Sequence, residues 1–177
     1  MANILLERNF SAPLAATQIK ASMDAPDGCL QIHRVMHKAS FLALDGGRMI
    51  CWFNAPDAEA TRVALRQMHI DISDVWAASC HEAPSKGVQG EANVVVERRF
   101  TEPVDLPSLQ AKEDAFAWCF ESHNVQFVRT FIANDRKRMV CMYRAPDAEA
   151  VRNTQRQAQM PMERVWAFNS IAPSVIA

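Results

Sequence analysis

The sequence predicts an α+β fold in which two tandem ferredoxin-like (βαββαβ) repeats pack as a pseudo-dimer, in the manner of a dimeric α/β barrel. The first observation behind this prediction is internal: residues 3–80 align without a gap with residues 93–170, and 29 of the 78 aligned pairs are identical. The second is the order of segment types in each copy. Strand-like and helix-like segments follow one another in the split βαβ order of ferredoxin-like domains. Two copies in one chain imply two like modules that can pack together.

The first strand and the first helix open each copy. Strands are predicted at residues 3–10 and 93–100, where Ile, Leu and Val are frequent. A hydroxyl residue and a proline follow each strand, which is a typical helix entry. Helices are therefore predicted from residue 14 to about 27 and from residue 107 to about 120.

The rest of each copy is two strands, a helix and a last strand. The run Ala-Pro-Asp-Ala-Glu-Ala predicts the second helix, with Pro56 and Pro146 expected in its first turn and acidic residues at its positive end. The strands are predicted at 33–44, 48–54 and 75–80, and at 123–133, 138–144 and 165–170. We expect the first repeat at residues 1–84, a linker at 85–92 with the repeat boundary there, and the second repeat at 93–177.

Composition limits the function. The formal net charge is -1 and the pI is about 6.5, which argues against a nucleic acid or an anionic membrane bound through bulk charge. No apolar run is long enough for a membrane helix, and the N-terminus lacks a signal-peptide pattern, so a cytoplasmic protein is expected. The five cysteines form no Cys-x-x-Cys pair, which favours reduced thiols over disulfides or a zinc ribbon.

One motif resembles a known family. The run from Cys141 to Arg152 reads Cys-x-x-x-Ala-Pro-Asp-Ala-Glu-Ala-x-Arg, it recurs from Cys51 to Arg62, and Val-Trp follows in both copies. This pattern is similar to a bacterial family of small ferredoxin-like domains, mostly of unknown function, that includes a dimeric nickel-binding protein. The resemblance covers both repeats. It implies the fold, the packing of two modules and nickel as a candidate ligand.

A cysteine and a histidine recur at equal spacing in both copies. Cys29 and His33 align with Cys119 and His123, and sulfur and imidazole are both good ligands for Ni(II). These four residues are the candidate metal ligands, although one Cys–His pair is too few for a complete site. The alternative is that each cysteine is a buried residue at a helix end and each histidine precedes a strand.

Charged residues and a cysteine recur on the predicted central strands. Buried charges need partners, so these positions predict either a polar pocket for a small ligand or a structural ion-pair network. The candidate pocket residues are Glu7, Arg8, Arg48 and Cys51, with their counterparts Glu97, Arg98, Arg138 and Cys141. An arginine beside either cysteine would activate the thiol, whereas the burial preference of cysteine favours an inert core residue.

Three functions remain open on this pattern. The leading hypothesis is a non-enzymatic protein that binds a metal ion, with nickel implied by the resemblance, or a small ligand, and that can form a homo-oligomer. The second is a cofactor-free enzyme of the dimeric α/β-barrel type, and the third is a structural or partner-binding module. No nucleophile–base–acid set is present at the sequence level, so no catalytic residue is assigned.

Overall fold

The computed structural model describes residues 1–23, 28–83 and 90–173. The chain divides into two compact units. Unit 1 consists of Met1–Ala78 together with the chain from Phe168 onward, and unit 2 is Ser79–Ala167. Each unit is built on one of the two sequence repeats, and each is described in turn.

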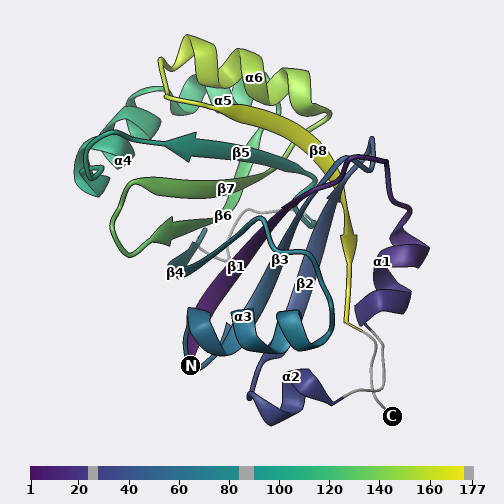
Figure 1. Ribbon diagram of the computed structural model, residues 1–177. Coiled ribbons are helices and arrows are strands. Elements are labelled where there is room, and N and C mark those ends of the chain that lie inside the picture. The colour runs from purple at the N-terminus through teal and green to yellow at the C-terminus, as the bar shows by residue number, and fades with distance from the viewer. Residues whose placement is uncertain (24–27, 84–89, 174–177) are drawn as a thin grey trace. The chain divides into compact units, whose positions relative to one another are not determined.

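Unit 1 has the predicted order of elements (Figure 1). Its sheet places β1 between β3 and β4, all antiparallel, and β2 on the other side of β3. The helices α2 and α3 contact each other, and α3 also contacts β3. The elements are β1 Ala2–Asn9, α1 Ala16–Met23, α2 Cys29–Ile32, β2 Met36–Ala43, β3 Arg48–Ala55, α3 Ala58–Gln67 and β4 Asp74–Glu82.

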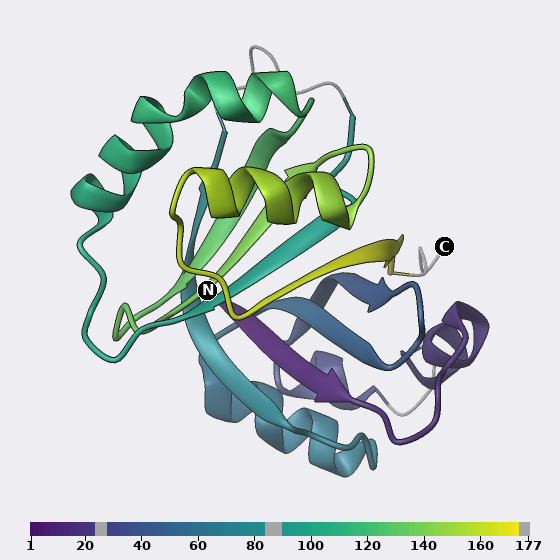
Figure 2. The same ribbon diagram turned by 90° about the horizontal axis from the view of Figure 1, so that it is seen from above.

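Unit 2 repeats this arrangement. Its central strand β5 lies between β7 and β8, and β6 lies on the other side of β7. Helices α4, α5 and α6 lie on one side of this sheet (Figure 2). The elements are β5 Val94–Arg99, α4 Leu106–Ala115, α5 Ala117–Ser122, β6 Gln126–Ala133, β7 Arg138–Arg144, α6 Ala148–Gln157 and β8 Arg164–Ile171.

The last strand of each repeat runs beyond its own unit. The first half of β8 pairs with β5, whereas its end pairs with β2, from Phe168 opposite Ala43 to Ile171 opposite Ser40. In the same way β4 leaves β1 and its end neighbours β6, where the amide of Ala83 donates to the carbonyl of Val128 at 2.8 Å. The predicted α+β class and the two βαββαβ repeats are confirmed. The predicted boundaries at 84, 85–92 and 93 stay predictions.

The helix starts differ from one prediction. Pro56 and Pro146 do not lie in the first helical turn, because α3 and α6 begin two residues later. The aspartates are the N-caps: Asp57 accepts from the amide of Ala60 at 2.7 Å, and Asp147 makes the equivalent bond at 2.8 Å. A capping side chain satisfies an amide that has no partner within the helix, so it determines the first residue of the helix.

The first helix of each repeat is also broken. The segment predicted as one helix from residue 107 to 120 is two helices, α4 and α5, which meet at Phe116. In the first repeat α1 ends at Met23 and α2 begins at Cys29, while residues 24–27 of that prediction lie outside the described residues. None of the helices formed by the described residues is long and apolar enough to cross a membrane.

The alternation along the central strands decides which charged residue faces the helices. Arg8 and Arg98 follow the side-chain face of Leu6 and Val96, which belong to the cores beneath the helices. Glu7 and Glu97 point to the opposite face, where they accept hydrogen bonds from Trp76 and Trp166. The two charges of each pair therefore lie on opposite faces of the sheet.

Candidate functional site

Cys141 marks the sheet side of a cavity in unit 2. It lies in the middle of β7, and its side chain faces α4 because Met139 and Tyr143, two residues away on either side, face the same core. Two polar neighbours contact its sulfur. The Oγ1 atom of Thr130 lies 3.2 Å from Sγ, and Nε of Arg98 donates to it at 3.4 Å.

Arg98 is the organising charge of this site. Its side chain is 1% exposed, and it donates to Tyr143 Oη at 3.2 Å, to Gln155 Oε1 at 2.8 Å and to the carbonyl of Pro161. Burial alone would lower the pKa of Arg98, but the nearby Cys141 and Tyr143 raise it, so the guanidinium stays charged. Among the described residues no carboxylate lies within ion-pair distance of Arg98, and the sulfur of Cys141 is its softest contact.

The helix side of the cavity comes from one face of α4. Leu106, Leu109, Gln110 and Glu113 recur at intervals of three and four residues, so they line the same side of the helix. Burial raises the pKa of Glu113, with Arg98 and the Tyr143 hydroxyl opposing this shift. The Tyr143 hydroxyl donates to Glu113 Oε1 at 3.4 Å, which links Arg98 to the cavity wall.

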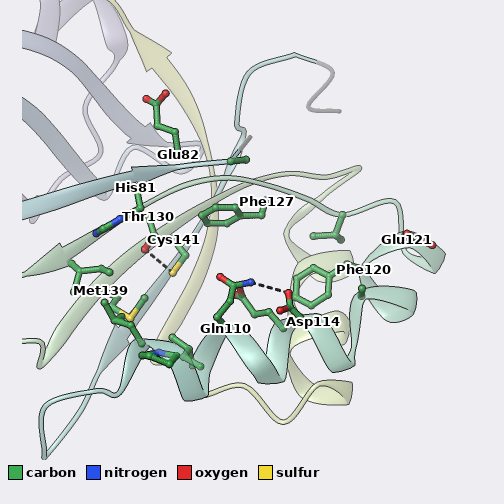
Figure 3. A pocket seen from close by; sticks show the side chains of 18 residues that line it. His81, Glu82, Gln110, Asp114, Phe120, Glu121, Phe127, Thr130, Met139 and Cys141 are labelled. Atoms are coloured by element: carbon green, nitrogen blue, oxygen red, sulfur yellow. Dashed lines mark hydrogen bonds between the residues drawn. The ribbon is translucent and has the colours of Figure 1, made fainter. Parts of the chain in front are cut away.

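The cavity between these two sides has a volume of about 630 Å³. Figure 3 shows Thr130 and Cys141 on the sheet side and Gln110 and Asp114 on the helix side. Glutamate and aspartate contribute four carboxyl groups to the lining, and neither lysine nor arginine is among the described lining residues. The lining is His81, Glu82, Ala83, Leu106, Pro107, Leu109, Gln110, Glu113, Asp114, Ala117, Phe120, Glu121, Val125, Phe127, Thr130, Ile132, Met139 and Cys141.

The matching position in unit 1 is arranged differently. Phe53 and Leu65 stand where unit 2 has Tyr143 and Gln155, so Arg8 has no equivalent acceptors. Arg8 instead lies over the ring of Phe10, at 4.8 Å, and its Nε has no hydrogen-bond partner among the described residues. Burial raises the pKa of the Cys51 thiol to about 11, against weaker opposing effects of Ser40 and Arg8.

The glutamates and the other two arginines of the predicted pocket lie elsewhere. Glu7 accepts from Trp76 Nε1 at 3.0 Å and from Arg48 at 3.4 Å. Glu97 accepts from Trp166 Nε1 at 2.6 Å. Arg138 is the first residue of β7, opposite Arg99. None of Glu7, Glu97, Arg48 and Arg138 lines the described cavity, whereas Cys141 does and Arg98 contacts Cys141.

The predicted metal ligands are placed in pairs at helix ends. In unit 2, Cys119 Sγ donates to Gln157 Oε1 at 2.8 Å, and His123 Nε2 lies 3.3 Å from the same oxygen. In unit 1, His33 Nε2 lies 2.9 Å from Gln67 Oε1, and Cys29 begins α2. Over residues 1–23, 28–83 and 90–173, no three His, Cys, Asp or Glu side chains gather as a metal site. Each pair thus supplies too few donors to fit a nickel ion by itself.

Several pocket residues were missed at the sequence level. Gln110, Glu113 and Thr130 carry no repeat signal, because none of them is identical in the two repeats. A difference between the two repeats would have indicated this site better than a residue that they share. Two core positions that are apolar in the first repeat, Phe53 and Leu65, become polar in the second, and this change indicates a buried polar cluster in only one copy.

The comparison with protein families agrees with the resemblance read from the motif. Residues 95–167 match the family described as "Nickel responsive protein SCO4226-like". The second repeat resembles that family. The predicted resemblance to this family is therefore confirmed, on a match that covers less than half of the chain. No curated protein matches the sequence.

The comparison with solved structures concerns the fold. A protein provisionally described as a chlorite dismutase has a TM-score of 0.57 and 10% identity, with 97% of this chain and 94% of that chain covered. A heme-binding protein from Thermus thermophilus has a TM-score of 0.48 and 10% identity, with 96% and 91% covered. The fold is that of dimeric α/β-barrel proteins, and such low identities show the fold alone.

Proposed function

We propose that unit 2 binds a small, mostly apolar organic molecule that carries a positively charged group. The cavity of about 630 Å³ has the size of a small-molecule site. Its walls supply apolar contacts through two leucines, two phenylalanines, Val125, Ile132 and Met139. An apolar ligand body would be taken out of water there, with a gain of roughly 25 cal/mol for each Å² buried.

The charge of the lining carries the choice of ligand. Glu113, Asp114 and Glu121 line the cavity, and the described lining contains no lysine or arginine. Arg98 lies behind Glu113 and is linked to it through the Tyr143 hydroxyl, while Glu82 is paired with Arg129 at 3.5 Å. Carboxylates at a cavity attract cations and repel anions, and the rings of Phe120 and Phe127 add a second attraction for a cation that lies over them. An ammonium or amidinium group suits this lining better than a carboxylate.

A series of three ligands tests the proposal. The compounds 2-naphthylmethylamine, 2-naphthylmethanol and 2-naphthoic acid share one aromatic body and differ in head group, and each is titrated into the protein by calorimetry. We expect the amine to bind tightest and the acid weakest. Glu113→Gln should weaken binding of the amine by about fivefold or more and leave binding of the alcohol unchanged. A tenfold change in affinity corresponds to about 1.4 kcal/mol.

The matched control is Glu102→Gln. Glu102 is exposed and does not line the cavity, so its loss changes the net charge by the same amount without altering the pocket. If the two variants weaken amine binding equally, the preference for the amine comes from the net charge of the protein and not from the pocket. If no member of the series binds, or if the acid binds best, the proposal is wrong.

Nickel is the second candidate ligand, favoured by the family resemblance and by the approach of Cys119 and His123 to one amide oxygen. Because each pair is incomplete, further donors are needed for a site. Tag-free, reduced protein is titrated with Ni(II) and compared with the His33→Ala, His123→Ala double variant. Unchanged affinity in that variant excludes these histidines, and no binding by the wild type removes nickel.

A further inference from the structure

The two equivalent cysteines differ in what surrounds the sulfur. Cys51 is fully buried, and its sulfur accepts a hydrogen bond from Ser40 Oγ at 3.0 Å. Cys141 is similarly buried as a residue, yet it lines a cavity and its sulfur contacts the Arg98 guanidinium at 3.4 Å. A nucleophilic cysteine needs a positive neighbour and access for its reaction partner. The described surroundings of Cys141 contain both.

The positive neighbour cannot easily move away. Arg98 is fixed by Tyr143, Gln155 and the Pro161 carbonyl, and Tyr143 and Gln155 are themselves fully buried. The Gln155 amide nitrogen of the same cluster is buried without a hydrogen-bond acceptor among the described residues, so one donor of the cluster is left unused. A guanidinium held in contact with a sulfur is the positive neighbour that a nucleophilic cysteine requires.

We propose that Cys141 is a nucleophile of the unit 2 cavity and that it captures soft carbon electrophiles, such as apolar α,β-unsaturated carbonyl compounds. The proposal uses the cavity of the proposed function but does not require a cationic ligand. The thiol proton is lost to solvent and the sulfur bonds to the β-carbon. The carbon–carbon π electrons move to form an enolate, and the α-carbon then takes a proton from water. The product is a thioether, and no oxidant or reductant is consumed.

The test compares cysteines within one molecule. Reduced wild-type protein is treated with less than one equivalent of phenyl vinyl ketone, and the rate of adduct formation at each of the five cysteines is measured by peptide mass spectrometry. We expect Cys141 to react at least about tenfold faster than Cys51, although both residues are buried. Equal rates at the two positions would refute the proposal.

Two further measurements separate reactivity from mere access. Arg98→Lys keeps a positive charge but shortens the side chain and loses the Nε contact, so the rate at Cys141 should fall by about tenfold. Thr130→Val removes a contact with the sulfur but leaves Arg98 in place, and should have a smaller effect. An unchanged rate in Arg98→Lys refutes the role of Arg98. Should that variant fail to fold, the wild-type ratio of Cys141 to Cys51 still decides.

Competition connects the result to the ligand site without making one depend on the other. Saturating 2-naphthylmethanol should protect Cys141 and leave the half-buried Cys29 and Cys80 unprotected. Selective reaction of Cys141 together with no binding of the naphthyl series would leave the nucleophile and remove the cation pocket. Binding of the series without a faster reaction at Cys141 would leave the ligand pocket and refute the nucleophile.

Discussion

Arg8 and Arg98 occupy the same position in two aligned strands. Arg8 lies partly exposed over a phenylalanine ring, whereas Arg98 is fully buried and donates hydrogen bonds to four partners. The backbone around them is the same, so the difference comes from two neighbours. Tyr143 and Gln155 offer oxygen atoms to Arg98, where Phe53 and Leu65 offer none to Arg8. The arginine with acceptors around it is fully buried, and the arginine without them stays partly exposed.

The arginines give the largest expected difference. Arg98→Met leaves Tyr143, Gln155 and a carbonyl without their donor and should lower the free energy of unfolding by about 3 kcal/mol or more. Arg8→Met should cost about 1 kcal/mol or less, because it loses mainly a ring contact. Urea denaturation of the two variants measures both values. Similar costs would mean that the buried cluster is not what holds unit 2 together.

Exchanging the residues beside the two arginines between the repeats should destabilise the protein. Phe53→Tyr places a hydroxyl in a fully buried apolar site and should cost about 1–3 kcal/mol. Tyr143→Phe removes the oxygen that Arg98 contacts and should cost about 1–2 kcal/mol. Adding Leu65→Gln to Phe53→Tyr should recover part of the first loss, because Arg8 can then donate hydrogen bonds to two acceptors. Strict additivity in this double variant would argue against that account.

The helix caps are where the repeats should behave alike. Asp57→Ala and Asp147→Ala each remove a side-chain acceptor from a first-turn amide, at 2.7 and 2.8 Å. Each change should lower the free energy of unfolding by about 1 kcal/mol. Chemical denaturation of both variants, with Asp57→Asn and Asp147→Asn as capping-competent controls, checks this. A large inequality between the two would show that the repeats differ beyond the Arg98 cluster.

The smallest effect concerns pH. Burial raises the pKa of Glu113 in the folded protein, so its contribution to stability is present at low pH and is lost as pH rises through that pKa. Glu113→Gln cannot ionise and should therefore gain stability relative to the wild type as pH rises from about 4 to about 7. Thermal unfolding across this range measures the difference. A stability difference between the two proteins that stays constant with pH would contradict the raised pKa of Glu113.

The sequence was informative about what both repeats share. The gapless alignment predicts the order of elements, and the Ala-Pro-Asp run predicts where α3 and α6 begin to within two residues. It misplaced the prolines because both proline and a capping aspartate are compatible with a helix start, and only the cap geometry chooses between them. The break at Phe116 is likewise a tertiary result, since residues 107–120 contain no glycine and no proline after Pro107.

The candidate site was predicted less completely. Arg98 and Cys141 were named because they recur, but recurrence equally named Glu7, Glu97, Arg48 and Arg138, which do not line the described cavity. Recurrence identifies the residues that the fold needs twice. A site present in one repeat depends on the positions that differ, such as Tyr143 and Gln155, and on the side chains that α4 brings over the sheet.

The crossing of β4 and β8 from one unit to the other has a consequence for any attempt to produce a single repeat. A fragment cut between the repeats would lose four residues of border strand and keep four that have no partner. Its sheet would end in an open edge, and an open edge is a template for another strand. The simplest strand available is the surplus end of a second copy of the same fragment. A halved chain would thus tend to pair with itself, restoring between two molecules what the duplicated gene holds within one.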